Sequence, residues 1–252
     1  IMKTFPIYVL LFVSAVFNSC NKNQKHPPDT VNITALLDIT DPMAIFPDAE
    51  SLLSIYDFPK DKNKEAFFRL TTTTDKLLNP AIELHLPPAE TTKKDNQFED
   101  PDFREKEVLA FYEEVRKSIA SFNTQKLEDT TLEHSECFRS IAGELTLMKE
   151  HKTGKCLLAV YSDLAENSDL DIVYGSGLQQ LLKHPDTTLK RFETTGLLPN
   201  DLSGFTVLFI YQPKDREDDQ RFNTMVRLYQ KMLSKRGATV IVSADNPKYI
   251  QL

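Results

Sequence analysis

The sequence lacks the short motifs that mark several common classes of enzyme. It contains no Gly-x-Gly-x-x-Gly segment and no phosphate-binding loop, so nothing in it supports nucleotide binding. Its five histidines are scattered and form no His-x-x-x-His pair, so the pattern does not predict a zinc site. The glycine-serine segments at 175–177 and 203–204 are more typical of turns than of nucleophile elbows.

An excess of positive charge is also missing. Lysine and arginine number 30 against 37 aspartate and glutamate residues, which gives a net charge of -7, so we expect no nucleic acid partner. The chain has 252 residues, of which 40% are hydrophobic and 27% are charged. These values are ordinary for a globular protein and sufficient for one large core or two small ones.

Cysteine is scarce, with three residues in the chain. Cys137 lies where we expect a helix to begin, and Cys156 where we expect the next strand to begin. A helix and a strand that run antiparallel would separate the two by about twelve residues of helix, or roughly 18 Å at about 1.5 Å per residue. A disulfide needs Cα atoms within about 7 Å. We therefore expect two buried free thiols.

The first 20 residues have the pattern of a secretory signal peptide. Lys3 gives a short basic start, residues 6–17 are nearly all apolar, and Ser19 and Cys20 end the run. The apolar stretch is too short for a convincing membrane span. Its ending resembles the lipobox of bacterial lipoproteins, in which Cys20 would be diacylated and become the new amino terminus, although Asn18 departs from the usual small residue. The alternative is an ordinary signal peptide cut near Ser19.

Residues 21–30 are polar and predict a tether. Lys22 and Lys25 stand where surface-exported lipoproteins of the Bacteroides group often carry acidic residues. On this resemblance we expect an exported lipoprotein, anchored in a membrane through Cys20, with the periplasmic face favoured over the cell surface.

Residues 31–252 predict one α/β domain, because segments of strand and helix character alternate along them. The order is strand, helix, hairpin, two helices, strand, helix, strand, helix, strand, and strands separated by helices imply right-handed parallel crossovers. Residues 157–161 are continuously apolar, which predicts a central strand buried on both faces. Residues 81–86 alternate and predict a half-buried strand paired with 67–74. The expected fold is therefore a doubly wound, mostly parallel sheet with one antiparallel edge strand.

Two of the expected strands end in acidic residues. The apolar run of residues 35–37 leads into Asp38, Thr40 and Asp41 before Pro42, and residues 157–161 lead into Asp163. Open α/β sheets bind their ligands at the carboxyl ends of the strands. We expect these two strand ends to lie side by side there.

This arrangement resembles the von Willebrand factor A domain over about residues 31–245. That family holds a divalent cation with an Asp-x-Ser-x-Ser motif after the first strand, a Thr from a second loop and an Asp after the fourth strand. Asp38 and Thr40 match the first and third motif positions, while Pro42 replaces the last Ser. Asp163 matches the Asp of the third loop, and Ser135 is the best candidate for the second loop.

The resemblance implies a site for Mg²⁺ or Ca²⁺ formed by Asp38, Thr40, Ser135 and Asp163. Mg²⁺ takes six hard oxygen ligands at about 2.0–2.1 Å and tolerates several waters, so these side chains would supply part of the shell. The alternative is that Thr40 and Ser135 cap helices or turns, and that Asp38 and Asp163 accept hydrogen bonds from loop amides.

In the family, the carboxylate of a partner protein completes the metal site, which makes the site adhesive and not catalytic. We therefore expect a membrane-anchored envelope lipoprotein whose module binds an unknown envelope protein, with Asp41, Glu166 and Asn167 at the contact. The acidic segment 166–171 could instead be a solvated turn.

Two other functions stay open. Asp38 to Asp41 resembles the Asp-x-Asp motif of haloacid dehalogenases, which would indicate a metal-dependent, phosphatase-like hydrolase. Thr40 there replaces the Asp that acts as general acid, which counts against this reading. The remaining alternative is a metal-free structural scaffold with the same fold.

Overall fold

A computed structural model of the chain describes residues 30–40, 45–60, 62–73, 79–89, 103–125, 134–151, 154–246 and 248. The expected signal peptide with Cys20, the tether at residues 21–29, and Asp41 and Pro42 lie outside these residues. Within the described part of the chain, no helix has the length and hydrophobicity that a membrane-spanning helix needs.

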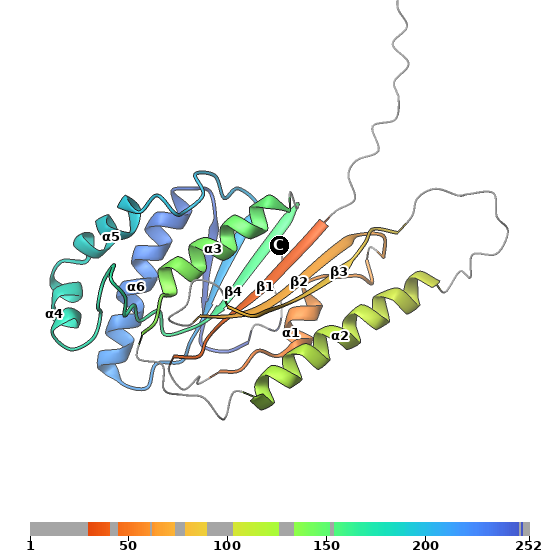
Figure 1. Cartoon of the computed structure of the whole chain (residues 1–252), viewed down its shortest axis with the longest axis horizontal. Helices are drawn as coiled ribbons and strands as arrows, with labels where there is room; N and C mark the ends of the chain where they lie inside the picture. The colour runs from red at the N-terminus through yellow and green to blue at the C-terminus, as the bar shows by residue number, and fades with distance from the viewer. Residues whose placement is uncertain are drawn as a thin grey trace, which may run out of the picture.

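Six strands form one sheet in the order β3-β2-β1-β4-β5-β6 (Figure 1). Neighbouring strands pair in parallel, except that β3 runs antiparallel to β2 at one edge. The prediction of a mostly parallel sheet with one antiparallel edge strand is confirmed. The strands are β1 (Thr30–Asp38), β2 (Glu65–Thr73), β3 (Ala81–Leu86), β4 (Lys155–Tyr161), β5 (Phe205–Ile210) and β6 (Thr239–Ser243).

Helices cover both faces of this sheet and divide the interior into two cores. One core lies between the sheet and helices α1 and α2, and the other lies between the sheet and helices α3 to α6. The order of helices and strands agrees with the order expected from the sequence, except that two helices, α4 and α5, lie between β4 and β5 where that order has one. The helices are α1 (Ala49–Ser54), α2 (Phe103–Gln125), α3 (Cys137–Glu150), α4 (Ser176–Lys183), α5 (Pro185–Thr194) and α6 (Arg216–Ser234).

Strand β4 is central, as its apolar run predicts. It pairs with β1 on one side and β5 on the other, and its residues from Cys156 to Tyr161 are buried. A strand covered by helices on both faces needs apolar side chains in both directions, which explains why its sequence does not alternate. Cys137 and Cys156 are both buried, and neither forms a disulfide within the described residues, as expected.

Strand β3 is more exposed than the expected half-buried strand. Its residues 81–83 and His85 are exposed, and only Leu86 is fully buried. Helix α3 packs on β1 and β4, so it leaves the β2 and β3 end of its side of the sheet uncovered (Figure 1). Glu83 and His85 lie on that open side, opposite Arg69 and Phe67 of β2.

The carboxyl edge as candidate functional site

Asp38 lies at the carboxyl edge of the sheet, where β1 and β4 end side by side. Leu37 of β1 pairs with Tyr161 of β4, so the next residues of both strands emerge together. Oδ2 of Asp38 accepts hydrogen bonds from Ser162 Oγ at 2.7 Å, Cys137 Sγ at 3.2 Å and Ser135 Oγ at 3.5 Å. Three separate segments of the chain therefore meet on one carboxylate.

The second oxygen of this carboxylate is also bound by the protein. Oδ1 of Asp38 accepts from the Thr40 hydroxyl at 2.6 Å and from the Thr40 backbone N–H at 3.1 Å. The residue is only 4% exposed. Burial, together with the nearby carboxylates of Asp38 and Glu166, raises the pKa of the Cys137 thiol, so this group stays a protonated donor. The result is a rigid, fully bonded aspartate.

Asp163 follows β4, as expected, but its carboxylate pairs with an arginine. Oδ2 of Asp163 lies 2.6 Å from Nη2 of Arg221 in α6, and Oδ1 accepts from the Ala165 N–H at 2.9 Å. The same Arg221 nitrogen binds Asp218 at 2.6 Å, and its guanidinium stacks over the ring of Tyr174, 4.9 Å from the centroid. A guanidinium therefore supplies positive charge at this edge.

Glu166 lies in the interior and binds the start of α3. It is fully buried, and its carboxylate accepts hydrogen bonds from the Phe138 N–H at 2.9 Å and from the Ser168 hydroxyl. Burial raises the pKa of Glu166 to about 7, against the opposing effect of these two donors. The side chain therefore anchors the N-terminus of α3 and does not reach the surface.

Asn167 holds the loop that leads into α3. Its backbone N–H and C=O exchange hydrogen bonds with the C=O and N–H of Ser135, at 2.9 and 3.2 Å, in an isolated β-bridge. This bridge brings Ser135 next to Asp38. Ser135 lies two residues before α3, which begins at Cys137, where the sequence predicted a helix to begin.

The structure thus brings Asp38, Thr40 and Ser135 together, and it engages Asp163 separately with Arg221. Ser162, Cys137 and Arg221 are the partners that the sequence reasoning missed. Ser162 could have been found from its position directly before Asp163 at the end of β4. Arg221 lies 58 residues after Asp163 and gave no local signal.

As arranged, these residues do not fit a divalent cation well. Both oxygens of Asp38 and both oxygens of Asp163 already accept hydrogen bonds from protein donors. In the described part of the chain, no three His, Cys, Asp or Glu side chains converge closely enough to hold a metal ion. A metal would have to displace hydroxyl donors from Asp38, and Arg221 already neutralises Asp163.

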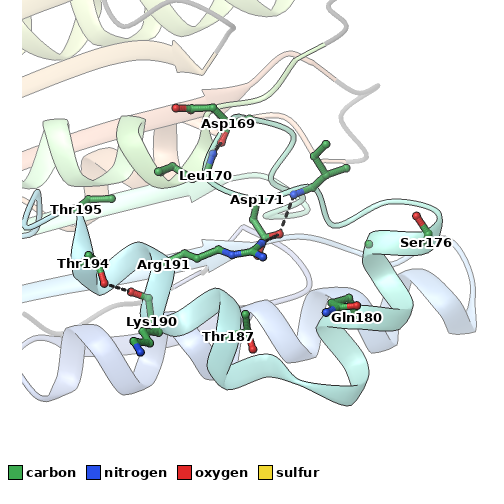
Figure 2. Close-up of a pocket in the computed structure, with 13 residues that line it drawn as sticks. Asp169, Leu170, Asp171, Ser176, Gln180, Thr187, Lys190, Arg191, Thr194 and Thr195 are labelled. Atoms are coloured by element: carbon green, nitrogen blue, oxygen red, sulfur yellow. Dashed lines mark hydrogen bonds and ion pairs between the residues drawn. The ribbon is translucent and has the colours of Figure 1, made fainter.

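An open groove of about 1060 Å³ adjoins this edge, between the loop at residues 168–172 and helices α4 and α5. Figure 2 shows Asp171 and Arg191 pointing toward one another across it, and Nη1 of Arg191 lies 2.7 Å from Oδ1 of Asp171. Thr188 of α5 also donates to Asp171, so α5 is fixed to the loop. Gln180 and Lys190 line the remaining walls.

Comparison with known proteins gives no further identification. No protein-family model matches the chain, and no curated protein matches it. The fold and the geometry of the carboxyl edge are therefore the basis for a functional proposal.

Proposed function

We propose that this chain is a membrane-anchored binding module of the cell envelope that engages a partner protein through the carboxyl edge of its sheet and the adjoining groove. The observation that carries the proposal is the wide open groove beside this edge, whose loop at residues 168–172 is fixed to α5 by the contacts of Asp171 with Thr188 and Arg191. Such a surface is pre-organised for contact, because few side chains would have to be ordered on binding.

The burial of Asp38 speaks against the hydrolase alternative. A nucleophilic or general-base carboxylate needs an oxygen that can reach the substrate. Asp38 is 4% exposed, and five donor contacts from four residues occupy its two oxygens. The Thr40 hydroxyl is one of these donors, so it stabilises Asp38 instead of acting as the missing general acid.

The geometry favours a module whose contact does not need a metal. Arg221 supplies the positive charge that a cation would bring to Asp163, and it is also held by Asp218, which binds the same guanidinium nitrogen, and by the ring of Tyr174. A von Willebrand A-like cation site at Asp38, Thr40, Ser135 and Asp163 would require the Arg221 guanidinium to move away from Asp163. Membrane anchoring through Cys20 rests on the lipobox-like sequence.

Site-specific photo-crosslinking in intact cells tests the proposal. A photoreactive residue at Gln180, in the wall of the groove, should give one discrete adduct with an envelope protein. The matched control is a photoreactive residue at Lys117, which lies exposed on α2 on the opposite side of the sheet. The adduct should form without added Mg²⁺ or Ca²⁺ and should persist in a chelator.

Equal labelling from both positions, or no adduct from Gln180, would contradict the binding proposal. Turnover of a generic phosphate ester that is lost in Asp38→Asn would instead support the hydrolase. An adduct that requires divalent metal would support the binding module but overturn its metal-free form.

A further inference from the structure

A second cavity lies on the other half of the molecule, on the open side of the sheet. It has a volume of about 260 Å³ and is enclosed by β1, β2 and β3 and by the C-terminal end of α3. It is separate from the groove between α4 and α5, with which it shares no lining residue. The residues that matter for the argument are Asn32, Thr34, Phe67, His85, Met148 and His151.

Its floor carries a buried polar group without a partner. Thr34, in the middle of β1, is 0% exposed, and its hydroxyl oxygen finds no hydrogen-bond partner in the part of the chain that the structure describes. Asn32, two residues earlier on the same face of the strand, is 3% exposed and also lines the cavity. Buried hydroxyls are normally paired, so an unpaired one that lines a cavity indicates a ligand with a complementary group.

Aromatic and apolar side chains form much of the walls of the cavity, beside the charged pair Arg69 and Glu83. Phe67 stacks on His85 with ring centroids 4.3 Å apart and ring planes 3° apart, and His151 lies 5.1 Å from Phe67 on a tilted plane. Met148 contributes its flexible thioether from α3. An engineered cavity of about 150 Å³ accepts benzene, so a volume of about 260 Å³ has room for one six-membered ring with a small substituent.

The described charged groups that line or adjoin the cavity are paired with one another. Arg69 binds Glu144 through two hydrogen bonds, at 2.8 and 3.2 Å, and also binds Glu83. His85 lies 2.8 Å from Glu65. An anionic ligand would meet Glu83 and Glu144, and the described residues around the cavity offer it no unpaired cation. A buried ammonium would lose its hydration. The cavity therefore suits a neutral ligand.

We propose that this cavity binds a neutral aromatic ring with a hydroxyl group, that is, a phenol. The hydroxyl of the ligand reaches Thr34 and Asn32, whose side chains can each donate and accept a hydrogen bond. A phenol hydroxyl can also donate and accept, so it can pair with either side chain. The ring lies against Phe67, His151 and Met148, where edge-to-face or offset contacts stabilise it. The phenol is either a small molecule or the side chain of a partner's tyrosine.

A pair of probes that differ only in the hydroxyl tests the proposal on the purified full chain. p-Cresol should bind at least tenfold more tightly than toluene, and it should shift the methyl resonance of Met148 in NMR spectra, a signal that Met148→Leu would assign. Thr34→Val keeps the shape of the side chain and removes the hydroxyl, so it should abolish the preference for p-cresol while toluene still binds. Thr71→Val is the control, because Thr71 is buried on β2 but does not line this cavity.

Equal binding of both probes to the unaltered chain, an unchanged preference in Thr34→Val, or no shift of Met148 would each overturn the proposal. If Thr34→Val did not fold, Phe67→Leu should weaken the binding of both probes to the same degree. Unchanged binding of the probes to Phe67→Leu would also overturn the proposal. The two sources of the phenol are distinguished by N-acetyl-tyrosinamide, which should bind as p-cresol does if a partner's tyrosine is the ligand. Binding of p-cresol alone would identify a small molecule.

Discussion

Replacement of Glu166 by glutamine should change how the stability of the protein depends on pH. Glu166 is fully buried, and burial raises its pKa from 4.5 to about 7. Between these two pH values the folded protein holds a proton that the unfolded chain has released. The free energy of unfolding therefore falls as the pH rises through this window, and the contribution of Glu166 becomes constant above about pH 7.

The size of the effect follows from the same two pKa values. At about 1.4 kcal/mol per pKa unit, a pKa raised from 4.5 to about 7 corresponds to about 3 kcal/mol by which burial disfavours the ionised form. Glutamine has nearly the same shape and no charge, and its side-chain oxygen can still accept from the Phe138 N–H. The difference in unfolding free energy between Glu166→Gln and the unaltered protein should therefore shift by about 3 kcal/mol in favour of the variant from pH 4 to pH 8.

Urea unfolding at half-unit steps from pH 4 to pH 8 measures this difference directly. Asp169→Asn is the matched control in the same loop. The side-chain hydrogen bond with Arg139 lowers the pKa of Asp169, so the contribution of Asp169 to stability changes only at lower pH. The dependence of the unfolding free energy on pH between pH 5 and pH 8 should therefore be the same in Asp169→Asn as in the unaltered protein. A constant difference between Glu166→Gln and the unaltered protein over the whole range would refute the reasoning.

Four further outcomes are expected. Asp163→Ala should destabilise the fold by about 3 kcal/mol, measured by urea unfolding, because it removes a partner of the mostly buried Arg221. The double variant with Arg221→Met should recover part of this loss, whereas additive losses would contradict a direct pair. Leu158→Asp would bury an unpaired carboxylate in the central strand and should prevent soluble expression, so a cooperatively folded variant would be evidence against its central position. Cys20→Ala should release the protein from membranes or block its processing, and unchanged fractionation would exclude lipid anchoring at this residue. Mg²⁺ or Ca²⁺ should leave the melting temperature unchanged while Arg221 is present, and a rise that grows with metal concentration would show a metal site after all.

Much of the fold was predictable because the relevant signals are local. The apolar run at 157–161 predicted the central strand, and the alternation of segments of strand and helix character predicted an α/β domain. Helix α6 begins at Arg216, six residues before its first apolar residue, Phe222. Asp215 caps it by accepting from the N–H groups of Glu217 and Asp218, and this acidic first turn carries no apolar residue to mark the helix.

The sequence by itself determined which side chains stand at the carboxyl edge, because Asp38 ends one buried parallel strand and Asp163 lies two residues after the end of another. Only the tertiary structure decided what these carboxylates bind. Arg221 meets Asp163 because α6 packs against the sheet, and Thr34 lines an open cavity because α3 covers β1 and β4 but not β2 and β3. Pairings between residues far apart in the chain depend on how helices pack over the sheet, and that packing has no signature in the local periodicity of the sequence.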